Sequence, residues 1–128
     1  MSTSDPLLAP MEGTEHKELG GVQMDIARVG TGRVKRVVYP PGFHWSRDIK
    51  PSVGTSHCMH AHVGFIVKGT VEVEFPDGCK KKFTAPQVVE IEPGHDGRVV
   101  GNESAVLIEF DFEGETARHM GMPDSHRH

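Results

Sequence analysis

The chain has 128 residues and a formal net charge of −4 at pH 7. This length suits a single domain with one core. The negative charge balance leaves no basic footprint for nucleic acid, so we exclude that class of partner. The N-terminus lacks the basic and apolar regions of a signal peptide, and no apolar stretch is long enough to span a bilayer. We therefore expect a cytoplasmic protein without a membrane partner.

The two ends of the chain differ in composition from its middle. Residues 1–18 are polar, contain prolines and lack periodicity, which predicts a flexible N-terminal arm or a strap between subunits. Residues 114–128 form a polar segment with several histidines, which we predict to be a flexible C-terminal tail. Residues 19–113 remain as the folded domain.

Short apolar runs, many of them rich in valine, follow one another through this domain. Val71, Val73 and Phe75 alternate with glutamates, a pattern typical of a strand buried on one face. Turn residues separate the runs, and helix signals are poor, so we predict an all-β sandwich or jelly-roll barrel without helices. The predicted strands are 22–29, 33–39, 58–68, 70–75, 79–84, 88–92, 98–100 and 105–112.

Two further details of the pattern concern charged and titratable residues. Residues 105–112 have apolar side chains at the even positions, with Glu109 and Asp111 on the opposite face. Residues 92–97 read E-P-G-H-D-G, which predicts a tight corner that leaves His95 at the end of a strand.

Residues 57–62 read H-C-M-H-A-H, the densest group of metal-ligand side chains in the chain. If the strand is unbroken, Cys58, His60 and His62 point to one face. Their imidazoles and thiol suit a first-row transition metal when another ligand completes the site. The alternative interpretation is a pair of half-buried histidines with no ligand role.

The residues around this cluster carry a family resemblance. Residues 54–69 and 86–102 resemble the two consensus motifs of the cupin superfamily (RmlC-like), and the chain is similar to small single-domain bacterial cupins. The first motif is G-x5-H-x-H-x3,4-E-x6-G. Counting forward from Gly54 places its two histidines at His60 and His62, with no glutamate after them.

Counting backward from Gly69 gives a second register of the same motif. This register places His62 at the glutamate position, with Cys58 and Ser56 at the histidine positions. We prefer it because the glycine marks the turn into the next strand. Positions 56, 58, 60 and 62 share a face in either register.

The second motif, G-x5-P-x-G-x2-H-x3-N, is matched at its central glycine by Gly94. Gly97 stands at the position of the ligand histidine, and His95 lies two residues earlier. The resemblance implies an all-β cupin fold, a double-stranded β-helix or jelly-roll barrel. The metal ligands that it implies here are Cys58, His60, His62 and His95.

The resemblance also implies a cofactor and partners. The cofactor would be a divalent transition metal, Zn, Fe, Ni or Cu, and a small-molecule ligand would occupy the barrel for oxygenase or isomerase chemistry. The alternative is a metal-free module that binds or senses a small molecule without catalysis. A homodimer is expected, because a two-fold mate can cover the edge strands of a small barrel.

Two more residues are candidates for lining a ligand pocket. Trp45, the only tryptophan, could stack on a ligand ring or pack in the core. Arg98 follows the second corner. An inward guanidinium there would favour a carboxylate or phosphate ligand, whereas an outward one would be a solvated strand residue.

Overall fold

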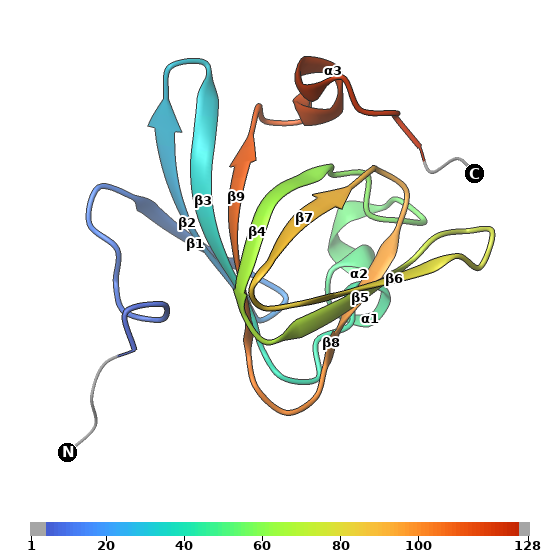
Figure 1. Cartoon of the computed structure of the whole chain (residues 1–128), viewed down its shortest axis with the longest axis horizontal. Helices are drawn as coiled ribbons and strands as arrows, with labels where there is room; N and C mark the ends of the chain where they lie inside the picture. Colours follow the sequence, from blue (N-terminus) through green and yellow to red (C-terminus); the bar gives the residue numbers. More distant parts are fainter. Residues whose placement is uncertain (1–4, 126–128) are drawn as a thin grey trace.

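The computed structural model describes residues 5–125, in which two antiparallel sheets enclose a common core (Figure 1). The larger sheet has the order β1-β2-β3-β9-β4-β7 and consists of β1 (Glu15–Leu19), β2 (Val22–Val29), β3 (Gly32–Tyr39), β9 (Ala105–Asp111), β4 (His62–Lys68) and β7 (Gln87–Ile91). The smaller sheet has the order β6-β5-β8 and consists of β6 (Lys80–Thr84), β5 (Thr70–Glu74) and β8 (Asp96–Val100).

Strand β9 closes the larger sheet from the far end of the sequence. It lies between β3 and β4 and pairs with both in antiparallel orientation. The first half of the folded domain is therefore joined to its last strand, and residues separated by some 80 positions share one wall of the barrel, as in the pair Arg33 and Asp111.

Strand β5 shows why these sequences form half-buried strands. Val71 and Val73 are buried, while the intervening Glu72 lies on the outer face. The cross-strand partners of Glu72 are Lys82 on β6 and Arg98 on β8. Opposite charges therefore flank the carboxylate on the solvent side, and valines fill the inner side.

The core lies between the two sheets and contains side chains from nearly every strand. Burial of this apolar surface is the main term that stabilises such a barrel. The members of the buried cluster are Val22, Val37, Phe43, Trp45, Ile66, Val71, Val73, Phe75, Phe83, Val89, Ile91, Val99, Ala105 and Leu107.

The chain passes from the larger sheet to the smaller one at Gly69, between β4 and β5. Gly69 has φ +79°, and a Cβ there would lie 2.5 Å from the backbone oxygen of Ser104. Only glycine fits this position. The crossing between the sheets thus depends on Gly69, the glycine from which the preferred register of the first cupin motif is counted.

Most of the predicted strands are confirmed. Seven of the eight runs coincide with strands to within two residues at each end. The eighth differs, because β4 begins at His62 and not at Cys58. The predicted all-β class is confirmed.

The prediction that helices are absent is wrong, although the helices are short. They are α1 (Trp45–Asp48), α2 (Lys50–Val53) and α3 (Thr116–Met120). Helices α2 and α3 each end at a glycine in the left-handed conformation, Gly54 and Gly121. Segments of four or five residues are too short to show a helical period in the sequence.

The predicted arm and tail both contain regular structure. Strand β1 begins inside the segment 1–18, and α3 lies inside the segment 114–128. Every side chain of β1 is exposed. The strand therefore lacks the alternation of apolar and polar residues by which a sequence reveals a half-buried strand. Residues 1–4 and 126–128 of the predicted arm and tail lie outside the described residues.

No helix in the described part of the chain is long and apolar enough to cross a membrane.

Candidate metal centre

Three of the predicted ligands meet in the barrel. The donor atoms of Cys58, His62 and His95 all lie within 4.8 Å of one another, and Cys58 Sγ is 3.9 Å from His62 Nε2. His62 opens β4, whereas His95 precedes β8. The Cys58 amide donates to the carbonyl oxygen of His95 at 2.7 Å, so a backbone bridge holds the two loops together.

The expected unbroken strand through Cys58 is wrong. The Cys58 backbone pairs with His95 in an isolated bridge, and the β4 ladder begins only at His62. The bridge between Cys58 and His95 brings the corner at residues 92–97 into the site. The convergence therefore depends on two loops and one strand, and not on alternation along a single strand.

Hydrogen bonds orient both imidazoles of this group. His62 Nδ1 donates to Glu109 Oε1 at 2.9 Å, and His95 Nδ1 donates to the carbonyl oxygen of Glu92 at 2.9 Å. In the neutral form of each ring, the Nδ1 proton is used in this bond and Nε2 keeps its lone pair for a metal. A carboxylate or carbonyl behind the distal nitrogen is the usual support of a metal-ligating histidine.

Electrostatics favour ionised groups along the line from Cys58 to Glu109. Burial acts to raise the pKa of Cys58, but hydrogen bonds from His62 and His95 outweigh it and lower the pKa to about 5. Burial acts to lower the pKa of His62, but the Glu109 charge and the Cys58 thiolate raise it to about 10. Burial opposes ionisation of Glu109, yet His62 lowers its pKa to about 2. When no metal is bound, these pKa values make Cys58 a thiolate, His62 an imidazolium and Glu109 a carboxylate, with His62 between the other two.

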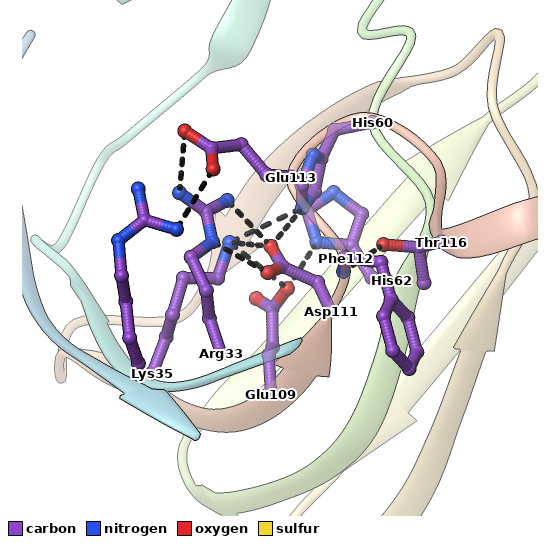
Figure 2. A network of polar contacts seen from close by, with 10 residues as sticks. Arg33, Lys35, His60, His62, Glu109, Asp111, Phe112, Glu113 and Thr116 are labelled. Atoms are coloured by element: carbon purple, nitrogen blue, oxygen red, sulfur yellow. Dashed lines mark hydrogen bonds and ion pairs between the residues drawn. The ribbon is translucent and has the colours of Figure 1, made fainter. Parts of the chain in front are cut away.

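A second cluster, centred on Asp111, adjoins this group (Figure 2). Arg33 binds the fully buried Asp111 carboxylate through two nitrogens at 2.7 and 2.9 Å, and Lys35 Nζ lies 2.7 Å from it. His60 Nε2 lies 3.1 Å from the same carboxylate. Burial acts to raise the pKa of Asp111, but hydrogen bonds from His60, Arg33 and Lys35 hold it far below its usual range.

His60 belongs to this second cluster and not to the group around Cys58. Its Nε2 lies 3.1 Å from Lys35 Nζ. The atoms of His60, His62 and Glu109 also lie within 4.8 Å of one another, but the Lys35 ammonium already supplies positive charge there. The group of Cys58, His62 and His95 is therefore the better set of metal donors.

Two adjoining cavities reach the donors. A cavity of about 70 Å³ and another of about 320 Å³ share Cys58, His62 and an aromatic wall that includes the buried Trp45. Arg98 borders the smaller cavity, but its guanidinium donates to Glu72 at 2.9 Å and its side chain is 47% exposed. Trp45 thus packs in the core cluster and also lines both cavities, and Arg98 is held by its neighbour on β5.

The sequence analysis missed Glu109, Asp111, Arg33 and Lys35 as residues of the site. The available signal was their register: Arg33 pairs with Asp111 and Lys35 with Glu109 across β3 and β9. Side chains of directly opposed residues share a face, so two basic residues facing two acidic ones indicate an ion cluster. The apolar even-numbered face of β9 concealed this, although Phe110 proves to be 43% exposed.

Comparisons with known proteins agree with this architecture. No protein-family model matches the chain, and no curated protein sequence does. Solved structures do match it. A cupin 2 conserved barrel domain protein from Salinispora arenicola has a TM-score of 0.53 and 15% identity, with 85% of this chain and 88% of that one covered. An RmlC-like cupin from Shewanella frigidimarina has a TM-score of 0.51 and 20% identity, with 86% and 92% covered.

A third match is hydroxypropylphosphonic acid epoxidase from S. wedmorenis, solved in complex with fosfomycin. It has a TM-score of 0.54 and 9% identity, and the alignment covers 79% of this chain but only 56% of the epoxidase. These matches define the class of the barrel: the chain has the cupin fold. The predicted cupin fold is confirmed.

Proposed function

We propose that this protein is a metal-binding cupin that holds a small molecule in its barrel beside the metal. Cys58, His62 and His95 are the proposed ligands. The observation that carries the proposal is the convergence of one sulfur and two nitrogen donors, with a hydrogen bond fixing each imidazole from behind.

The donor chemistry fits a divalent transition metal. Two ligands of a tetrahedral zinc ion, one sulfur and one nitrogen, are separated by ~3.6 Å, close to the 3.9 Å between Cys58 Sγ and His62 Nε2. A metal needs a deprotonated thiol, and the hydrogen bonds that lower the pKa of Cys58 supply one at neutral pH. Mixed sulfur and imidazole donors suit Zn, Fe, Ni or Cu.

The residues around the donors have distinct roles in this proposal. Three protein ligands leave a position for water or substrate, and a bound metal would act there as a Lewis acid or redox centre. Glu109 fixes the tautomer of His62. Trp45 and Phe43 line both cavities and limit access of water to the donors. We propose oxygenase or isomerase chemistry at this position, without ranking the two.

A metal-free small-molecule-binding module is the second candidate. It is favoured because the charges of Cys58 and His62 balance each other when no metal ion is bound. The lowered pKa of Cys58, about 5, and the raised pKa of His62, about 10, give a thiolate and an imidazolium that neutralise each other. In this alternative the histidines are polar walls of the pocket.

Metal content per chain distinguishes the two candidates. Protein purified without a tag, chelator or added metal is analysed by elemental mass spectrometry, beside His62→Ala, His95→Ala and Cys58→Ser. His60→Ala is the matched control, because His60 is a neighbouring imidazole outside the donor group. We expect one metal per chain in the wild type and in the control, and at least a tenfold loss in His62→Ala and His95→Ala.

Either of two results would overturn the proposal. One is an empty wild-type site that also fails to take up added zinc or cobalt. The other is full metal content in His62→Ala. For Cys58, cobalt loading gives an independent readout, since a thiolate–cobalt absorption band should appear in the wild type and vanish in Cys58→Ser.

A further inference from the structure

The larger of the two cavities has an apolar wall and a charged end. It has a volume of about 320 Å³ and extends from Leu19 on β1 to Cys58 and His62 at the candidate metal centre. Arg33, Lys35, His60 and Glu109 line its charged end. The apolar wall includes Leu19, Val22, Met24, Ile26 and Val37.

Lys35 brings a spare hydrogen-bond donor to this charged end. An ammonium group has three N–H donors. Asp111 at 2.7 Å takes one of them, and His60 Nε2 at 3.1 Å takes at most one more, because this nitrogen donates to Asp111 when it carries a proton. The Lys35 side chain is only 7% exposed, so bulk water has little access to the third. An anionic oxygen entering the cavity can accept it.

Glu109, at the same end of the cavity, has an acceptor oxygen that needs a hydrogen-bond donor. Its Oε1 accepts from His62 Nδ1, but within residues 5–125 its buried Oε2 has no hydrogen-bond partner. A buried carboxylate oxygen without a donor is unfavourable, and such groups find a donor in water or a ligand. Lys35 Nζ lies 4.0 Å from Glu109 Oε1, so the spare donor and the unpartnered acceptor are neighbours.

We propose that this cavity binds a small organic acid that carries a hydroxyl or amino group beside its carboxylate and a short apolar tail. This rests on the ligand cavity of the proposed function and names the class of its ligand. The carboxylate accepts from Lys35, and the adjacent O–H or N–H donates to Glu109 Oε2. The tail lies along Val22, Met24 and Val37. An amine without a carboxylate would be repelled by the Lys35 ammonium. A carboxylate without a neighbouring O–H or N–H would leave Glu109 Oε2 without a hydrogen-bond donor.

Trp45 provides the readout, because it is the only tryptophan and it lines this cavity. The probe is 2-hydroxyhexanoate, titrated into wild-type protein and followed by tryptophan fluorescence, with norleucine as the amino counterpart. Hexanoate lacks the donor, and 1,2-hexanediol lacks the carboxylate. We expect 2-hydroxyhexanoate or norleucine to bind at least tenfold more tightly than both of these controls. Equal affinities, or no saturable change with any probe, would overturn the inference without relying on any variant.

Variants then assign the two interactions. Lys35→Met should weaken binding of 2-hydroxyhexanoate at least tenfold, and Glu109→Gln should abolish its advantage over hexanoate. Lys82→Met, a lysine on the outer face of β6, is the control and should change affinity less than twofold. Thermal unfolding by circular dichroism identifies any variant that does not fold, in which case the probe series on wild-type protein decides.

Zinc content measured on the same samples separates this inference from the proposed function. Stoichiometric zinc with no preference for the hydroxy or amino acid overturns the inference and leaves the metal site standing. A metal site that stays empty after zinc or cobalt is added, together with the expected preference, overturns the metal proposal and supports the inference.

Discussion

At the scale of single residues, the unusual feature of this barrel is the number of charges that it buries. Asp111 is only 1% exposed and is held by Arg33, Lys35 and His60. Desolvating these groups is unfavourable, and their mutual attraction compensates only while the cluster is complete. The wall beside the candidate metal centre therefore depends for its stability on a complete set of charge partners.

Removing the central charge should expose this dependence. Asp111→Asn leaves Arg33 and Lys35 without their shared counterion, and we expect the free energy of unfolding to fall by about 3–5 kcal/mol. Urea denaturation followed by circular dichroism measures the change. Glu113→Gln is the control, because Glu113 is an exposed partner of Arg33 and should matter by less than about 1 kcal/mol. Similar losses in both variants would contradict the central role of Asp111.

At the scale of elements, β1 is the strand with the weakest support. All of its side chains are exposed, and it pairs only with β2 at the edge of the larger sheet. One cross-strand pair gives it a specific anchor: His16 lies opposite Asp25, with His16 Nδ1 2.9 Å from Asp25 Oδ1. The docking of this edge strand should therefore depend on pH.

The sign of this dependence follows from the hydrogen bonds of His16. Bonds to Asp25 and then Glu18 raise the pKa of His16 above its usual value near 6.5. The protonated form is favoured in the fold, so its stabilisation is complete below the unfolded-state pKa and is lost as pH rises through the higher folded-state pKa. We expect amide exchange in β1 to accelerate as pH rises across this window, beyond the intrinsic increase. His16→Gln should remove the excess, and an unchanged profile in this variant would contradict the assignment.

The order of strands also explains how the site is assembled. β9 lies between β3 and β4, so it brings Glu109 to His62 on one side and to Lys35 on the other. The corner before β8 supplies His95. Each element carries one or two of the polar groups, and none of them forms a site by itself.

At the scale of the whole molecule, the outer face of the larger sheet carries an apolar patch. We define it by Phe65 on β4, Val88 on β7 and Phe110 on β9, which are 40%, 75% and 43% exposed. Phe65 pairs with Val88 in register, and the Phe65 and Phe110 rings are 6.5 Å apart. Contiguous exposed apolar residues of this kind mark interaction sites. We propose that a second copy of the chain covers this patch, which gives the expected homodimer a specific face.

Light scattering coupled to size-exclusion chromatography tests this proposal. We expect a dimeric mass for the wild type and a monomeric one for Val88→Asp at the same concentration, since a buried unpaired carboxylate is strongly unfavourable at an interface. Val29→Asp is the matched control, because Val29 is 61% exposed at the end of β2 and outside the patch. A monomeric wild type, or a dimer that survives Val88→Asp, would reject this face.

Local pattern in the sequence was enough to predict much of the fold. Alternation along β5 and the turn at Gly69 depend on neighbours a few positions away, and the structure agrees with them. The cluster at residues 57–62 and His95 likewise contained the three donors that meet. These features were accessible because strand alternation and turn conformation are local properties of the backbone.

Tertiary structure alone decided which of these residues form the site. The bridge between Cys58 and His95 and the placement of His60 with Lys35 join distant segments, and no local period encodes them. The inward face of β9 was decided in the same way. Glu109 and Asp111 turn inward because β3 presents Lys35 and Arg33 opposite them. A charge can be buried only when such a partner neutralises it, and that partner is chosen by the pairing of strands far apart in the chain.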